Sequence, residues 1–216
     1  MPITTLQEQN FPKWCELQHY EIIKLNANDS RVFERKEKRE KIIICSGNAR
    51  LTFLDNGVQS MNVSDKANVD ISDDVSSFEL DEIKDSLIAV RMAGTWGKEL
   101  GGSGLFSMKN FESDSQEDIG DPVPYDKKTR LDSHFHDCDE YWIAYSGNAC
   151  AVSENKEYFL NTGDCLITGM GHHHDIKYVV EPLEAVYFET TLMGKKRRGH
   201  LWNHTHGTAE PVLDRV

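Results

Sequence analysis

The sequence predicts an all-β chain made of two copies of one β unit. Helical periodicity is scarce in its 216 residues, and short apolar runs alternate with turn-forming residues at the spacing typical of sandwiches and barrels. The chain also repeats itself, since positions 40–49 read EKIIICSGNA and positions 140–149 read EYWIAYSGNA. Six of these ten positions agree, and we interpret the offset of 100 residues as a duplication.

The predicted strands of the first copy are apolar runs that end at turn residues, after a mixed N-terminal arm. Ser46-Gly47-Asn48 is predicted to turn the run at 42–45 back onto 49–54 as a hairpin. The same three residue types recur at 146–148, where a second hairpin is expected. Strands of the first copy are predicted at 20–25, 31–33, 42–45, 49–54, 67–71, 77–80 and 86–92.

A glycine-rich segment from Gly94 to Gly104 is predicted to connect the copies. It holds five glycines but lacks the Lys-Ser/Thr of a phosphate-binding loop, which favours a flexible connector over a nucleotide cradle. We therefore assign residues 1–93 to an N-terminal domain and 94–216 to a C-terminal domain with a tail. Strands of the second copy are predicted at 105–108, 140–145, 149–152, 157–160, 165–168, 172–180 and 184–191.

The composition argues against several classes of partner and says little about a small substrate. At a net charge of −12 the chain would repel the phosphates of nucleic acids and of anionic membranes. The sequence contains no run of 18 apolar residues, the length needed to span a bilayer. The N-terminus also lacks the pattern of a signal peptide, so a cytoplasmic location is expected. The five cysteines are an odd number without CxxC spacing, which indicates free thiols.

A histidine-rich stretch in the second copy is the candidate metal site. His134 and His136 lie two residues apart on a predicted strand, so their imidazoles point to one face. Glu140 can join them after a tight turn, and His174 comes from a separate strand. Three imidazole nitrogens and one carboxylate oxygen suit a divalent transition metal and leave coordination positions open for a substrate.

The first copy lacks this set of ligands. Glu34 and Lys36 stand where the repeat places His134 and His136. Because a lysine at that position would repel a cation, only the second copy is predicted to bind metal.

The pattern of residues in the second copy resembles the cupin family. Lys128 replaces the glycine that opens the first cupin motif, while Gly169 and Tyr178 replace the usual proline and asparagine of the second. The remaining motif positions match at their spacing: His134, His136, Glu140, Gly147, Gly163, Gly171 and His174. The resemblance implies a bicupin of two jelly-roll barrels with a degenerate N-terminal barrel. It also implies one Fe, Mn, Ni or Zn ion on the four ligands, and a homodimer.

Other side chains are candidates for the surroundings of the metal. Trp142 shares strand parity with Glu140 and should face into the barrel, either as a wall of a substrate pocket or as an ordinary core residue. His172 shares parity with His174 and is expected to line the mouth of the site or to replace it as a ligand. The basic tail at 195–198 is either an anion site or a solvated turn. The tail histidines 200, 204 and 206 form a lid, a second metal site or neither.

Three functions are consistent with these residues. The first is a metal-dependent isomerase, epimerase or lyase acting on a sugar or a hydroxy acid, with Glu189 or Tyr187 as candidates for the proton-transferring group. The second is an iron(II) dioxygenase that uses the same ligands. The third is a non-catalytic module that binds a small ligand.

Overall fold

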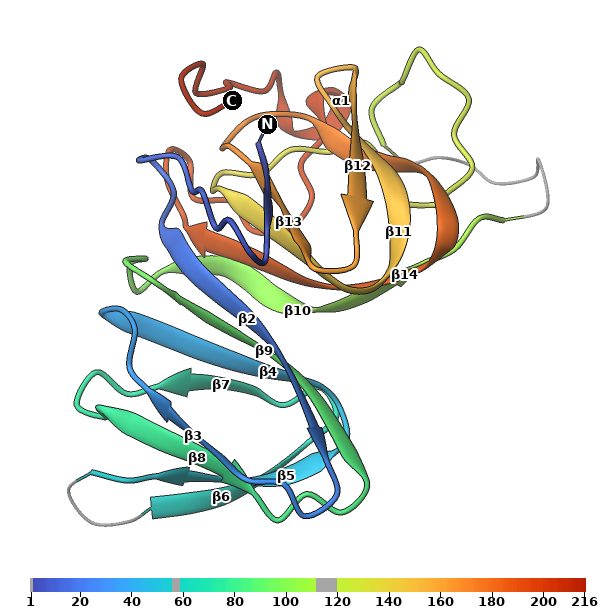
Figure 1. Cartoon of the computed structure of the whole chain (residues 1–216). Coiled ribbons are helices and arrows are strands. Elements are labelled where there is room, and N and C mark those ends of the chain that lie inside the picture. The colour runs from blue at the N-terminus through green and yellow to red at the C-terminus, as the bar shows by residue number, and fades with distance from the viewer. Residues whose placement is uncertain (1, 56–58, 112–119) are drawn as a thin grey trace. The chain divides into compact units, whose positions relative to one another are not determined.

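Strands make up almost all of the regular structure of the chain, as Figure 1 shows for a computed structural model. Residues 2–55, 59–111 and 120–216 are described. Over these residues the chain forms strands β1 to β14 and one short helix, which confirms the predicted all-β class. Within the same ranges, no helix has the length and apolar character needed to cross a membrane.

The chain divides into two units, each with its own hydrophobic core. One unit is Glu16–Trp96, and the other joins the N-terminal arm up to Cys15 to Gly97–Val216. The predicted assignment of residues 1–93 to the first domain is therefore wrong for the arm. The arm contributes β1 (Ile3–Thr5), which pairs with β13 (Asp164–Thr168) of the second unit. A strand of three residues carries too little periodicity to reveal its partner in the sequence.

The first unit is an eight-stranded antiparallel jelly roll, as the cupin resemblance implied. Its two four-stranded sheets have the orders β2-β9-β4-β7 and β3-β8-β5-β6, so the first strand lies beside the last and the second beside the last but one. The strands are β2 (Leu17–Asn26), β3 (Arg31–Glu34), β4 (Arg39–Ser46), β5 (Asn48–Phe53), β6 (Gln59–Ser64), β7 (Asn68–Ile71), β8 (Ser77–Asp81) and β9 (Ser86–Gly94).

The shared Ser-Gly-Asn segment is a corner between sheets rather than a hairpin turn. β4 pairs with β7 and β9, whereas β5 pairs with β6 and β8. The predicted hairpin is therefore wrong, because the runs that flank Gly47 belong to different sheets. A Cβ on Gly47 would lie 2.0 Å from the carbonyl oxygen of Ser86, so the corner requires glycine at this position.

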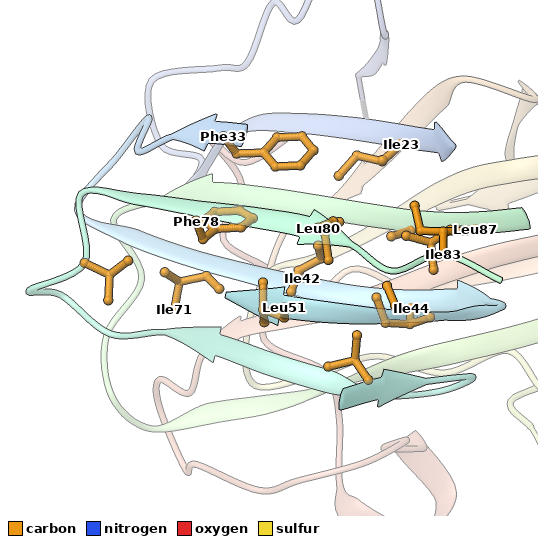
Figure 2. Packing of buried hydrophobic residues seen from close by; sticks show 14 residues of the cluster. Ile23, Phe33, Ile42, Ile44, Leu51, Ile71, Phe78, Leu80, Ile83 and Leu87 are labelled. Carbon is orange, nitrogen blue, oxygen red and sulfur yellow. The ribbon is translucent and has the colours of Figure 1, made fainter. Parts of the chain in front are cut away.

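Alternating apolar residues from both sheets form the core of the first unit (Figure 2). Phe33 and Phe78 stack with their ring centroids 5.2 Å apart. Ile42, Ile44 and Leu51 are fully buried beside them. Burial of a side chain of this size contributes about 1.5–3 kcal/mol, so this core accounts for much of the stability of the unit.

The second unit contains two long, bent strands that pair with each other. β11 (Glu140–Ser153) and β14 (His174–Thr191) pair through several shifts of register, and the sheet has the order β1-β13-β11-β14-β10, with β12 on β11. The first half of β11 pairs with β13 and the second half pairs with β12. Gly147, between the two halves, is therefore again a corner, and the second predicted hairpin is also wrong. The remaining elements are β10 (Leu100–Met108), β12 (Lys156–Asn161) and α1 (Asn203–His206).

Candidate metal centre

His134 and His136 belong to an extended stretch, called the HXH segment (residues 134–136). In space, this stretch lies between β14 and the C-terminal tail. His134 forms an antiparallel bridge with His174, and Phe135 forms one with Leu201. The backbone amide of His174 donates to the carbonyl of His134 at 2.9 Å. Because side chains alternate along an extended chain, His134 and His136 point to one side and Phe135 to the other.

The four predicted ligands lie together in the structure. One candidate ligand atom from each of His134, His136, Glu140 and His174 lies within 4.8 Å of the others, and all four residues are buried. Nε2 of His174 is 2.6 Å from Oε2 of Glu140, and Nε2 of His136 is 3.3 Å from the same oxygen. Two ligands bound at about 2.1 Å to one ion and at right angles would be about 3.0 Å apart, so these separations suit a shared metal.

Backbone carbonyls orient the three imidazole rings. Nδ1 of each ring donates a hydrogen bond to a carbonyl oxygen, which directs Nε2 toward the centre and fixes the tautomer that a metal requires. The acceptors for His134, His136 and His174 are the carbonyls of Asp132, Gly199 and His172, at 2.8, 3.1 and 3.0 Å.

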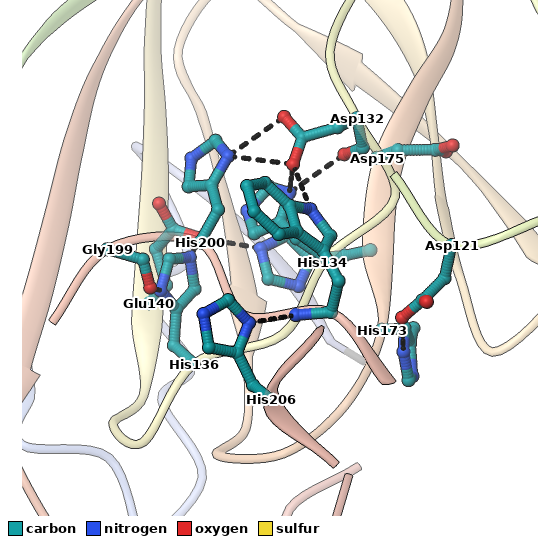
Figure 3. A network of polar contacts seen from close by, with 12 residues as sticks. Asp121, Asp132, His134, His136, Glu140, His173, Asp175, Gly199, His200 and His206 are labelled. Carbon is teal, nitrogen blue, oxygen red and sulfur yellow. Dashed lines mark hydrogen bonds and ion pairs between the residues drawn. The ribbon is translucent and has the colours of Figure 1, made fainter. Parts of the chain in front are cut away.

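Two of the inward-facing nitrogens have no hydrogen-bond partner. Among the described residues, Nε2 of His134 and Nε2 of His136 are both buried without a hydrogen bond, and Nε2 of His136 has only the 3.3 Å contact with Glu140. An unsatisfied buried polar atom is costly, and such atoms in native proteins call for an explanation. A cation held between these nitrogens and Glu140 would satisfy both, so the residues present fit a divalent transition metal (Figure 3).

The charges around the centre also suit a metal. Burial lowers the pKa of His134 well below its usual range, and the neighbouring His174 and His136 add to the effect. Burial acts to raise the pKa of Glu140, but His136 and His174 outweigh it and hold that pKa well below its usual range. Burial also opposes protonation of His136, yet the Glu140 carboxylate raises its pKa. A proton retained by His136 and Glu140 would be released when a cation binds.

A cavity of about 320 Å³ opens beside two of the four ligands, His134 and Glu140. Trp142 lines it and also belongs to the hydrophobic core of the unit, so both predicted roles describe this residue, and its ring lies 5.3 Å from that of His174. The other lining residues are Phe106, Leu131, His134, Glu140, Tyr187, Glu189, Gly199 and His200. A second, larger cavity of about 520 Å³ touches His174 alone among the four ligands, so the smaller one is the better candidate for a substrate.

The candidates Tyr187 and Glu189 both face this cavity, because β10 is rich in glycine. Gly102 is the cross-strand partner of Glu189 and Gly104 that of Tyr187. A Cβ on Gly104 would lie 2.9 Å from the Tyr187 ring, and one on Gly101 would lie 2.5 Å from the Glu189 carboxylate. The predicted flexible connector is therefore wrong, because these glycines belong to a strand that makes room for two large side chains. Burial, with Glu140 nearby, raises the pKa of Glu189.

His172 does not line the cavity beside the metal ligands. Its Nε2 donates to the Val212 carbonyl at 3.0 Å, and its Nδ1 lies 3.6 Å from the Glu154 carboxylate. The parity prediction fails because β14 begins only at His174. The preceding Gly171 has a φ of +79°, so the chain turns there and strand alternation does not extend back to His172.

The C-terminal tail reaches the site, and a lid is one of the roles that the sequence leaves open for its histidines. His200 stacks on His134 with ring centroids 3.6 Å apart, and its Nδ1 donates to the Asp132 carboxylate at 2.8 Å (Figure 3). Arg197 is not free to bind an anion, because its guanidinium donates twice to Asp137, at 2.8 and 3.0 Å. The tail therefore covers the HXH segment and supplies part of the cavity wall.

In the first unit a buried ion pair stands at the corresponding position. Glu40, the counterpart of Glu140 in the repeat, is buried and accepts hydrogen bonds from Arg91. Nη2 lies 2.9 and 2.8 Å from its two oxygens, and Nε lies 3.0 Å from one of them. The sheet register places Arg91 opposite Ile42, and the equivalent place in the second unit belongs to Tyr187. A guanidinium thus neutralises Glu40, where a metal would neutralise Glu140.

Comparisons with known proteins were made for the sequence and for the fold. No family model matches the sequence. The chain is 37% identical over 206 residues to the uncharacterized protein y4oW of Sinorhizobium fredii, and the match covers 95% of this chain and 92% of that protein.

Solved structures of cupin-family proteins resemble the fold. Oxalate decarboxylase of Bacillus subtilis, described with Mn(II) centres, has a TM-score of 0.58 at 10% identity, with 93% of this chain and 74% of that one covered. Tomato vicilin has a TM-score of 0.54 at 10% identity, with coverage of 81% and 74%. AerE of Microcystis aeruginosa has a TM-score of 0.53 at 10% identity, with coverage of 79% and 86%. At this identity the likeness establishes the fold.

Proposed function

The chain belongs to the same family as y4oW and has the cupin fold, and on this basis we propose that it is a metal-dependent enzyme acting on a small polar substrate. The reaction class that we favour is proton transfer, as in a sugar or hydroxy-acid isomerase, epimerase or lyase. One observation carries the proposal: two of the four predicted metal ligands, His134 and Glu140, line a cavity that also holds a second buried carboxylate, Glu189.

The residues of the site have separate roles in this proposal. His134, His136, Glu140 and His174 would hold one Fe, Mn, Ni or Zn ion. When bound, such an ion acts as a Lewis acid that lowers the pKa of a C–H group next to a coordinated substrate oxygen. Glu189 would accept the proton from that carbon, since its carboxylate faces the same cavity. Trp142 and Tyr187 would hold the substrate and exclude water.

A dioxygenase is the second candidate, and the character of the cavity wall supports it. Phe106, Leu131 and Trp142 form an apolar surface beside the ligands, which suits an apolar or aromatic substrate. Three imidazoles and one carboxylate also leave coordination positions for oxygen and substrate.

Metal analysis after loading with iron, manganese, nickel or zinc is the first test. One metal per chain is expected, and a chain that retains none would remove both enzymatic functions.

Candidate sugars and hydroxy acids are then incubated with the metal-loaded protein in deuterated buffer under argon. Deuterium uptake at carbon is expected, and it should be lost in Glu189→Gln at unchanged metal content.

The alternatives predict different results in the same assays. Oxygen consumption with turnover that stops under argon would replace proton transfer by the dioxygenase reaction. Tight binding of a ligand without turnover would indicate a non-catalytic module. The expected homodimer stays a prediction, which sedimentation of the metal-loaded protein would test.

A further inference from the structure

We propose that the ligand of the 320 Å³ cavity is a molecule with a single ring. Apart from the oxygens that would contact the metal, its groups are neutral or cationic. This inference rests on the proposed function and adds a substrate class to it. It follows from the size, the aromatic lining and the charge of the cavity.

The size and lining of the cavity suit one flat ring. Ligand sites commonly enclose about 300–1,000 Å³, so this cavity lies at the small end of that range. Phe106 and Trp142 form adjoining walls, with ring centroids 5.5 Å apart and planes inclined at 59°. Tyr187 and Leu131 add further apolar surface. Aromatic walls of this kind bind planar rings and the apolar faces of sugars through dispersion and stacking.

The charge of the cavity disfavours a further anionic group. Glu140 and Glu189 both line it, and its described lining includes no lysine or arginine. A divalent ion bound by one carboxylate carries one net positive charge, which the second carboxylate would balance. No lysine or arginine of the described lining is then left to pair with a carboxylate or phosphate on the far side of the ligand.

The nearby cationic groups are engaged elsewhere. The guanidinium of Arg198 donates to the carbonyl oxygens of Leu100 and Gly101 and does not line the cavity. His200 does line it, but its Nδ1 donates to the Asp132 carboxylate at 2.8 Å, so any charge on the ring is balanced there.

Glu189 is the residue that would determine the charge preference. Glycines across β10 leave room for its side chain, since a Cβ on Gly102 would lie 3.3 Å from its carboxylate. Its side chain is only 8% exposed, so it has few contacts with solvent that could screen it. A hydroxyl or amino group of the ligand could donate to this carboxylate, and a ring-bound cation would also face the Trp142 ring.

Titration calorimetry with three probes of similar shape tests the proposal. The probes are dopamine, catechol and protocatechuate, which share a benzene ring with two adjacent hydroxyl groups that can chelate a metal. At neutral pH dopamine is a cation, catechol is neutral and protocatechuate is an anion. The protein is loaded with zinc, which has no redox chemistry that could consume a catechol. Dopamine and catechol are expected to bind more tightly than protocatechuate by about tenfold or more, which corresponds to about 1.4 kcal/mol.

Two variants connect the preference to Glu189. Glu189→Gln keeps the shape of the side chain but removes its charge, and it should reduce the tenfold preference to about twofold or less. Glu184→Gln removes an exposed carboxylate from the same strand and should leave the preference unchanged.

The outcomes separate this inference from the proposed function. Protocatechuate binding as tightly as dopamine, an unchanged preference in Glu189→Gln, or no binding of any probe would overturn the inference while one zinc per chain sustains the metal site. Failure of the protein to retain zinc would overturn the proposed function itself.

Discussion

The buried ion pair between Arg91 and Glu40 allows a direct test of one inference about the two copies. In the first unit a guanidinium neutralises the carboxylate that a metal would neutralise in the second. Arg91→Ala removes a guanidinium that is 2% exposed and leaves Glu40, whose side chain is 0% exposed, without its partner. Three hydrogen bonds at 2.8–3.0 Å are lost at once. Removal of one member of a buried ion pair typically destabilises a protein by about 3–5 kcal/mol, because the remaining charge is left uncompensated. We expect a loss of that size in the free energy of unfolding of the first unit.

Urea unfolding followed by circular dichroism measures this loss. Arg50→Ala is the matched control, because Arg50 also pairs with a carboxylate but its side chain is 38% exposed. It should shift the unfolding midpoint far less, since solvent screens an exposed pair. Replacing both members together, Arg91→Met with Glu40→Leu, should recover most of the stability because no unpaired charge remains.

Two results would refute the reasoning. The first is an Arg91→Ala variant as stable as Arg50→Ala. The second is a double variant as unstable as Arg91→Ala alone, which would show that packing rather than charge is responsible. Metal content gives an independent readout: Arg91→Ala should retain one metal per chain, because the predicted ligands all belong to the second unit.

Three further predictions concern the second unit. His134→Ala should lose most of its bound metal in elemental analysis, whereas Glu34→Ala should keep it, because none of the four predicted ligands belongs to the first unit. Arg197→Ala should weaken metal affinity in a chelator competition, because Asp137, which Arg197 holds, directly follows the predicted ligand His136 in the chain. Gly104→Ala should lower the free energy of unfolding by about 1–3 kcal/mol, because its methyl group would overlap the Tyr187 ring.

Matched controls accompany these variants. Lys195→Ala removes a neighbouring tail cation whose ion pair with Glu210 is exposed and long at 3.4 Å, and metal affinity should be unchanged. Ser107→Ala changes an exposed position of β10 and should alter stability by no more than about 0.5 kcal/mol. Equal metal loss in Glu34→Ala and His134→Ala would contradict the assignment of the site to the second unit.

The positions of the ligands could be predicted because most of the information is local. His134, His136 and Glu140 lie within seven residues, and a spacing of two places side chains on one face of any extended chain. The same rule failed at His172, where a glycine with positive φ interrupts the extended backbone. Strand parity is therefore informative only as far as the strand extends.

The shared Ser-Gly-Asn segment shows a different limit. Its residue types correctly indicated a break in the strand but did not distinguish a hairpin turn from a corner between sheets. That distinction depends on which strands pair on either side of Gly47, and those partners lie far away in the sequence. Short-range turn chemistry does not encode it.

The all-β class, the duplication and the four candidate metal ligands could be predicted from the sequence alone. These follow from period-two alternation and from motif spacing, which are properties of neighbouring residues. Only the tertiary structure decided what surrounds them: the glycine strand that admits Glu189, the tail that places His200 over His134, and the arginine that neutralises Glu40. These contacts join residues tens of positions apart, so they depend on strand pairing and packing rather than on any local pattern.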